Sequence, residues 1–156
     1  MPTTDELAQV RAVAPGLRVV GEGDSPPAVK ILNLPSLDGW EPGRVWQRWK
    51  IDPQYFHAGG AMFGGYIAAL ADSLLGLVSM TVLDDSEAFT TSDLRISFFR
   101  AAISGTLTIE GRVIHRGRSM AHVEVDFTRD DGKLVAKATA TQIIVAASVA
   151  NTPQPQ

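Results

Sequence analysis

The chain contains no cysteine among its 156 residues. Disulfide bonds, thiolate catalysis and cysteine-ligated zinc or iron–sulfur centres are therefore excluded. Positive charge is also scarce, because 14 basic residues stand against 17 acidic ones and the net charge is −3. This balance disfavours a nonspecific nucleic-acid binder, which is usually basic. The sequence has no Gly-x-Ser-x-Gly elbow, no P-loop and no dinucleotide fingerprint, so it gives no support to an α/β-type serine hydrolase or a nucleotide-binding fold.

The remaining composition is that of one soluble domain. Hydrophobic residues make up 45% and charged residues 20% of the chain, which is ordinary for a globular protein. The first ten residues are acidic and polar and do not resemble a signal peptide, so we expect a cytoplasmic protein. Residues 61–80 are apolar enough to suggest a membrane span, but Asp72 near their centre would be costly in a bilayer. We therefore predict a helix inside a soluble domain.

The hydrophobic periodicity predicts one long helix and several strands. The helix begins at Gly64-Gly65 and ends near Met80, and Asp130-Asp131-Gly132 is a strong hairpin signal. Strands are expected over residues 44–51, 90–100, 106–115, 121–127 and 134–145. A helix that is apolar nearly all round must be covered on most sides. The pattern thus predicts an α+β fold in which a curved antiparallel sheet of about five to six strands wraps the helix.

The chain divides into three parts by composition. Residues 1–43 are expected to form a short helix, over residues 3–14, and a loop-rich arm. Residues 44–147 form the folded domain, and residues 148–156 a disordered tail.

A glycine-rich stretch joins the first strand to the helix and carries a family resemblance. Residues 57–72, HAGGAMFGGYIAALAD, resemble the signature of hotdog-fold acyl-CoA thioesterases of the phenylacetate-pathway (PaaI-like) type. Gly60, Gly64, Gly65 and Asp72 fall on the family spacing, and the resemblance extends over roughly residues 43–147. The family usually has asparagine where this chain has His57 and histidine where it has Phe63.

The resemblance implies a hotdog fold and an enzyme that hydrolyses an acyl- or aryl-CoA thioester to the free acid and coenzyme A. It implies no cofactor, because coenzyme A is part of the substrate. It also implies a homodimer, or a tetramer made of two dimers, whose active sites are shared between subunits. No nucleic-acid or membrane partner is expected.

Asp72 and Gly64 are the expected catalytic centre. A carboxylate on an apolar helix can activate water or attack a thioester carbonyl itself, although it can also be a structural group bonded to a neighbour. The free N–H groups at a helix start suit the oxygen that gains charge during attack, and the resemblance assigns this contact to the Gly64 amide. The two residues are eight apart, which is roughly 12 Å along a helix. The small residues Gly64, Ala68, Asp72 and Gly76 are four apart, so one side of the helix is narrow. Two such helices packed antiparallel along this side would bring Gly64 of one chain near Asp72 of the other. At least a dimer is therefore predicted.

Two further residues are candidates for the reaction. His57 can donate a hydrogen bond to the carbonyl, hold water or act as a base, or it can be an exposed turn residue. Thr91 stands where some relatives have a serine that orients water, or it is an ordinary strand residue. The resemblance also places Gly60, Phe63 and Gly65 at the substrate. His115 and His122 flank a turn, but no third metal ligand is evident, so no metal is expected.

Two alternatives to the thioesterase remain open. A non-catalytic acyl-CoA binding or sensing protein could use the same fold, although it would not need Asp72. A hotdog-fold hydratase would require a histidine paired with an acid in the pocket, and no such pair is found.

Overall fold

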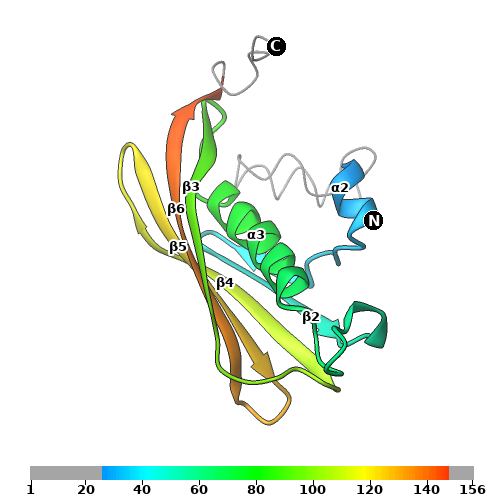
Figure 1. The fold of residues 1–156 in the computed structure, drawn as a ribbon. Helices are drawn as coiled ribbons and strands as arrows, with labels where there is room; N and C mark the ends of the chain where they lie inside the picture. Colours follow the sequence, from blue (N-terminus) through cyan, green and yellow to red (C-terminus); the bar gives the residue numbers. More distant parts are fainter. Residues whose placement is uncertain (1–25, 148–156) are drawn as a thin grey trace.

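The computed structural model describes residues 26–147 and contains one long helix packed on a single sheet (Figure 1). The predicted helix over residues 3–14 and the tail over residues 148–156 lie outside the described residues. The elements in chain order are α2 (Pro27–Ile31), β1 (Gly39–Glu41), β2 (Arg44–Lys50), the 3-10 helix η1 (Pro53–Tyr55), α3 (Gly64–Met80), β3 (Glu87–Phe98), β4 (Thr106–Arg116), β5 (Met120–Arg129) and β6 (Leu134–Ala146).

All six strands form one antiparallel sheet in the order β1-β2-β4-β5-β6-β3. The β4-β5 and β5-β6 connections are hairpins, and Gly132 in the second has the positive φ of 76° that its turn requires. Helix α3 carries the chain from β2, near one edge, to β3 at the other (Figure 1). β3 pairs with β6 from Glu87 to Phe98 and has no partner on its outer side among the described strands.

The core lies between α3 and the concave face of the sheet (Figure 1). One side of α3 is buried there through Tyr66, Ile67, Leu70, Ala71, Leu74, Leu75, Val78 and Ser79. The sheet contributes alternate residues such as Val45, Ile109 and Phe127, all of them fully buried. The core also contains Gln47, whose side-chain amide is buried without a hydrogen-bond partner among the described residues.

The small residues of α3 lie against β3. A β-carbon on Gly64 would be 3.2 Å from Cζ of Phe98, and one on Gly76 would be 3.3 Å from Cζ of Phe89. Because Gly64 and Gly76 have no side chains, the helix can lie close to these aromatic residues of the edge strand. Asp72 stands between the two glycines along the helix.

The predicted architecture is confirmed, with differences at its margins. Each of the five predicted strands is present, with ends displaced by up to three residues. The arm contains two short elements, α2 and β1, where little regular structure was expected. The helix is less enclosed than predicted, since Asp72 near its middle is exposed in the single chain. Within residues 26–147 no helix is long and apolar enough to cross a membrane.

Candidate functional site

The loop before α3 is fixed by its own backbone. The amide of Gly60 donates to the carbonyl of His57 (3.0 Å), and the amide of His57 donates to the carbonyl of Ala61 (2.9 Å). Gly60 has φ of 77°, a conformation that favours glycine. The amide of Phe63 donates to the carbonyl of Tyr55 (2.8 Å) and ties the end of the loop to η1. His57 is therefore carried by an ordered turn.

Helix α3 begins with two free amides. Phe63 is the N-cap residue and its side chain offers no acceptor. The amides of Gly64 and Gly65 meet no acceptor among the described residues. Unpaired N–H groups at a helix start carry partial positive charge and bind anionic or polarised oxygens. This end of α3 is therefore suited to a carbonyl oxygen that becomes negative.

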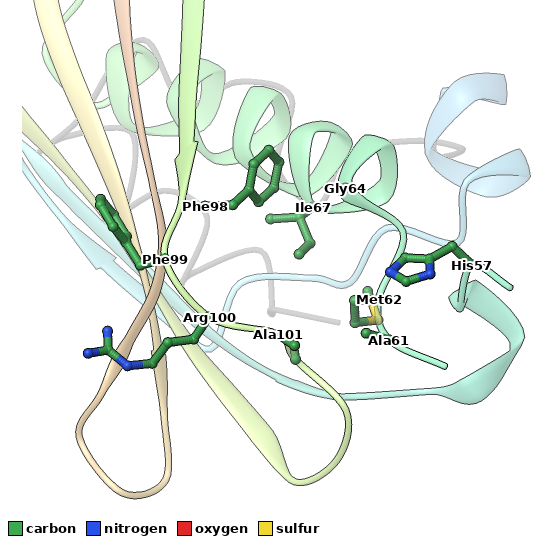
Figure 2. Close-up of a pocket in the computed structure, with 10 residues that line it drawn as sticks. His57, Ala61, Met62, Gly64, Ile67, Phe98, Phe99, Arg100 and Ala101 are labelled. Atoms are coloured by element: carbon green, nitrogen blue, oxygen red, sulfur yellow. The ribbon is translucent and has the colours of Figure 1, made fainter. Parts of the chain in front are cut away.

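A cavity of about 400 Å³ opens beside these amides (Figure 2). His57, Gly64, Ile67 and Phe98 are among the residues that line it, and the imidazole ring projects into it from the loop. Arg100 also lies at the cavity, but its guanidinium points away and donates to the carbonyl of Leu134 (2.7 Å). The cavity thus presents a histidine and a backbone amide in an otherwise apolar surrounding.

A second hollow of about 370 Å³ lies across the first turn of α3 and is called here the aromatic groove. Its lining residues are Leu32, Gln54, Tyr55, Phe56, Phe63, Gly65, Tyr66 and Ala69. The rings of Tyr55 and Tyr66 stack with centroids 3.8 Å apart. The hydroxyl of Tyr66 donates to the carbonyl of Asn33 (3.1 Å), and burial raises the pKa of this phenol well above its usual value. One wall of the groove is therefore a rigid, neutral aromatic surface.

Phe63 covers part of the helix start. It is 58% exposed, and a β-carbon on Gly65 would be 2.5 Å from Cε1 of its ring. Glycine at position 65 thus lets the phenyl ring fold back over the first turn. The predicted substrate contacts Phe63 and Gly65 both line the aromatic groove, whereas Gly60 shapes the loop and lines neither hollow.

Asp72 lies on α3 and Thr91 on β3, and neither lines the cavity that contains His57. The Asp72 carboxylate makes no hydrogen bond or ion pair with the described residues, and it is exposed. The hydroxyl of Thr91 donates to Oε1 of the buried Gln142 (2.9 Å), which turns it toward the concave face under α3. Gly64 and Asp72 are eight residues apart on one straight helix, so roughly 12 Å separates them along its axis. A single chain does not bring the two halves of the predicted site together.

Sequence reasoning missed two residues around the helix start. Gly59 is one of them, because its contact with His57 depends on how the turn folds. Tyr55 is the other, because its stacking on Tyr66 arises only in the folded chain. His115 and His122 face each other on β4 and β5 with ring centroids 6.4 Å apart. No group of three potential metal ligands occurs within residues 26–147.

A long helix held on one antiparallel sheet, with free amides at the helix start, is the arrangement of hotdog-fold proteins. The phenylacetic acid degradation-related protein of Ralstonia eutropha is similar to this chain in fold, with a TM-score of 0.69 and 28% identity over 79% of this chain and 93% of its own. A Streptococcus mutans protein solved with acetyl-CoA bound has a TM-score of 0.65 and 30% identity, over 70% and 87%.

The sequence comparisons agree with the fold. The model of the Thioesterase superfamily matches residues 59–136. A Saccharolobus solfataricus protein classed as an esterase is 34% identical over 121 residues, which are 78% of this chain and 81% of that protein. The chain belongs to the thioesterase superfamily and is a thioester hydrolase. The predicted hotdog fold, the resemblance to phenylacetate-pathway thioesterases and the enzyme class are thereby confirmed.

Proposed function

We propose that this protein is an acyl-CoA thioesterase that hydrolyses an acyl- or aryl-CoA to the free acid and coenzyme A. The observation that carries the proposal is the free Gly64 amide at the wall of a cavity that also contains His57. A thioester carbonyl placed there would accept a hydrogen bond from an N–H group at the positive end of a helix. The acetyl-CoA bound by the Streptococcus mutans relative supports the choice of a coenzyme A thioester.

The carboxylate of Asp72 supplies the second half of the reaction. As a general base it takes a proton from water while the water oxygen bonds to the carbonyl carbon, and the thiolate of coenzyme A then leaves. As a nucleophile it forms an anhydride with the acyl group, which water hydrolyses afterwards. Both routes give one acid and one thiol from one thioester and one water. Thr91 on β3 can hold the water through its hydroxyl oxygen, because its hydroxyl proton is donated to Gln142.

We propose that Asp72 acts on the substrate held by a second copy of the chain. β3 is a long edge strand whose outer side has no partner among the described strands. Native proteins usually cover such edges. Its inward-facing Leu94 and Phe98 are 38% and 51% exposed in the single chain. Joining two copies along β3 would cover these side chains and place two α3 helices antiparallel on one continuous sheet. The Asp72 of each copy would then approach the Gly64 of the other.

The aromatic groove is the proposed place for the acyl group. It begins at Gly65, one residue from the proposed carbonyl contact, and its walls are apolar. A flat aryl group or an aliphatic chain would gain hydrophobic contact there without leaving a polar group unpaired.

The test is hydrolysis of a panel of short, medium-chain and aryl acyl-CoA thioesters, followed by thiol release. Asp72→Asn keeps the size of the side chain and removes the charge, so kcat is expected to fall by roughly 10²–10⁴-fold, the range of general acid–base catalysis. Ser73→Ala, one residue further along α3, is the matched control. Binding of acyl-CoA without turnover by the wild type would contradict the proposal and favour a binding or sensing protein. Unchanged turnover by the Asp72→Asn variant would exclude the assigned role.

A further inference from the structure

The turn that carries His57 also fixes the orientation of its ring proton. The amide of Gly59 donates to Nδ1 of His57 across 2.9 Å. Only an unprotonated ring nitrogen can accept this bond, so the neutral imidazole has its proton on Nε2. Figure 2 shows the ring projecting from the loop into the cavity, toward the side of Met62 and Ile67. The nitrogen that remains available to a ligand is therefore an N–H donor.

Gly59 and the imidazole fit each other closely. A β-carbon at position 59 would lie 2.8 Å from Cε1 and 3.0 Å from Nδ1 of His57. The first of these distances is shorter than any ordinary carbon–carbon contact, so a side chain would push the ring out of place. Glycine at this position therefore allows both the hydrogen bond and the placement of the ring.

We propose that His57 acts as a neutral hydrogen-bond donor to the thioester carbonyl, and that Gly59 is the positioning residue that selects the required tautomer. This inference rests on the proposed thioesterase function. Nε2–H of His57 and N–H of Gly64 line the same cavity, and together they form a pair of donors for the oxygen that gains charge as the water attacks. His57 transfers no proton in this step. A base would need a free nitrogen, and here Nδ1 is bonded to the backbone while Nε2 carries the proton.

The first experiment compares two variants of the histidine. His57→Asn retains an N–H donor but cannot act as a base, and its kcat is expected to stay within about ten-fold of the wild type. His57→Ala removes the donor, and kcat is expected to fall by roughly 10²–10³-fold, as for other oxyanion donors. His115→Asn, an exposed histidine on β4, is the matched control. Equal loss in both position-57 variants would overturn the proposal.

The second experiment tests Gly59 through the histidine. Gly59→Ala is expected to slow the wild type but to have little effect in the His57→Asn background, where no tautomer has to be selected. A purely structural role would produce the same loss in both backgrounds and would contradict the assignment. Nitrogen-15 NMR of the labelled imidazole measures the tautomer without any substrate, with a protonated Nε2 expected and a protonated Nδ1 overturning the proposal. A wild type without turnover would contradict the proposed function instead, and the NMR result would still decide the tautomer.

Discussion

Gly64 occupies the first position of α3, where a backbone amide has no partner within its own helix. Proline is accepted at this position and removes the N–H group, and Phe63 already has the extended conformation that a following proline requires, with ψ of 124°. Gly64→Pro is therefore expected to preserve the helix and to lower kcat by roughly 10²–10³-fold through the loss of one oxyanion donor. The measurement is steady-state hydrolysis together with a circular dichroism spectrum.

Gly64→Ala is the control for this prediction. It adds a β-carbon at the same place, 3.2 Å from the ring of Phe98, but it keeps the amide. Its kcat is expected to fall less than that of the Gly64→Pro variant. Equal losses in the two variants would attribute the defect to crowding against Phe98 and would remove the evidence for a catalytic amide.

At the residue scale, the sequence indicated which residues are candidates for the site better than it predicted their exposure and contacts. The spacing from Gly64 to Asp72 was readable because the helix repeat is fixed. The exposure of Asp72 was not, because it depends on which side of α3 the sheet leaves uncovered. The bond between Gly59 and His57 arises from the fold of a short turn, which no periodic pattern describes. Strand alternation places Gln47 on the buried face, but the unpaired state of its amide depends on what packs around it.

At the scale of elements, the long segments were predictable and the short ones were not. α3 and the four long strands repeat their hydrophobic pattern often enough to be recognised. β1 has three residues and α2 has five, too few to show a hydrophobic period. β1 pairs with β2, which follows it closely in the chain, whereas the hydroxyl of Tyr66 on α3 donates to the carbonyl of Asn33 just after α2. The segment around α2 is thus held by a distant part of the chain, which no local pattern contains.

The outer face of the sheet carries a ladder of charges across β4, β5 and β6. Lys137 contacts Glu124 at 2.8 Å and Asp126 at 2.9 Å, and Arg112 contacts the same two carboxylates from the other side. Burial raises the pKa of Glu124, but hydrogen bonds from Lys137 and Arg112 outweigh it, and the net pKa lies below the usual value of 4.5. A carboxyl whose pKa is lower in the folded state stabilises the protein above its unfolded pKa. That stabilisation is lost as the pH falls below about 4.5 and through the folded pKa.

The ladder makes a prediction about acid stability. Lys137→Met removes a cation that favours the charged form of Glu124, so the variant is expected to be less stable than the wild type at about pH 7. The difference in free energy of unfolding should narrow as the pH falls from about 4.5 toward about 3, because the carboxylates become protonated in both proteins. Urea titrations at several pH values measure this difference. Lys50→Met, at the exposed end of β2, is the control, and a gap that stays constant with pH would contradict the role of the ladder.

At the scale of the whole molecule, the proposal that two copies share the site rests on the separation between Gly64 and Asp72 along α3. His57 and Gly64 line one cavity, while Asp72 lies on the exposed side of the same helix about two turns away. In the proposed dimer, a two-fold axis beside β3 would make each contact reciprocal, so two copies would give two complete sites. In this arrangement Gly64 and Asp72 of one chain belong to different sites.

This division can be tested by mixing two inactive variants. A dimer of one Gly64→Pro chain and one Asp72→Asn chain contains one site with both defects and one site with neither. Random pairing makes half of the dimers mixed, so the mixture is expected to recover about a quarter of wild-type turnover. The two chains are produced together with different tags, and the mixed dimers are purified through both before assay, where half of wild-type turnover is expected. If purified mixed dimers are as inactive as the parents, both residues act within one chain and the shared site is wrong.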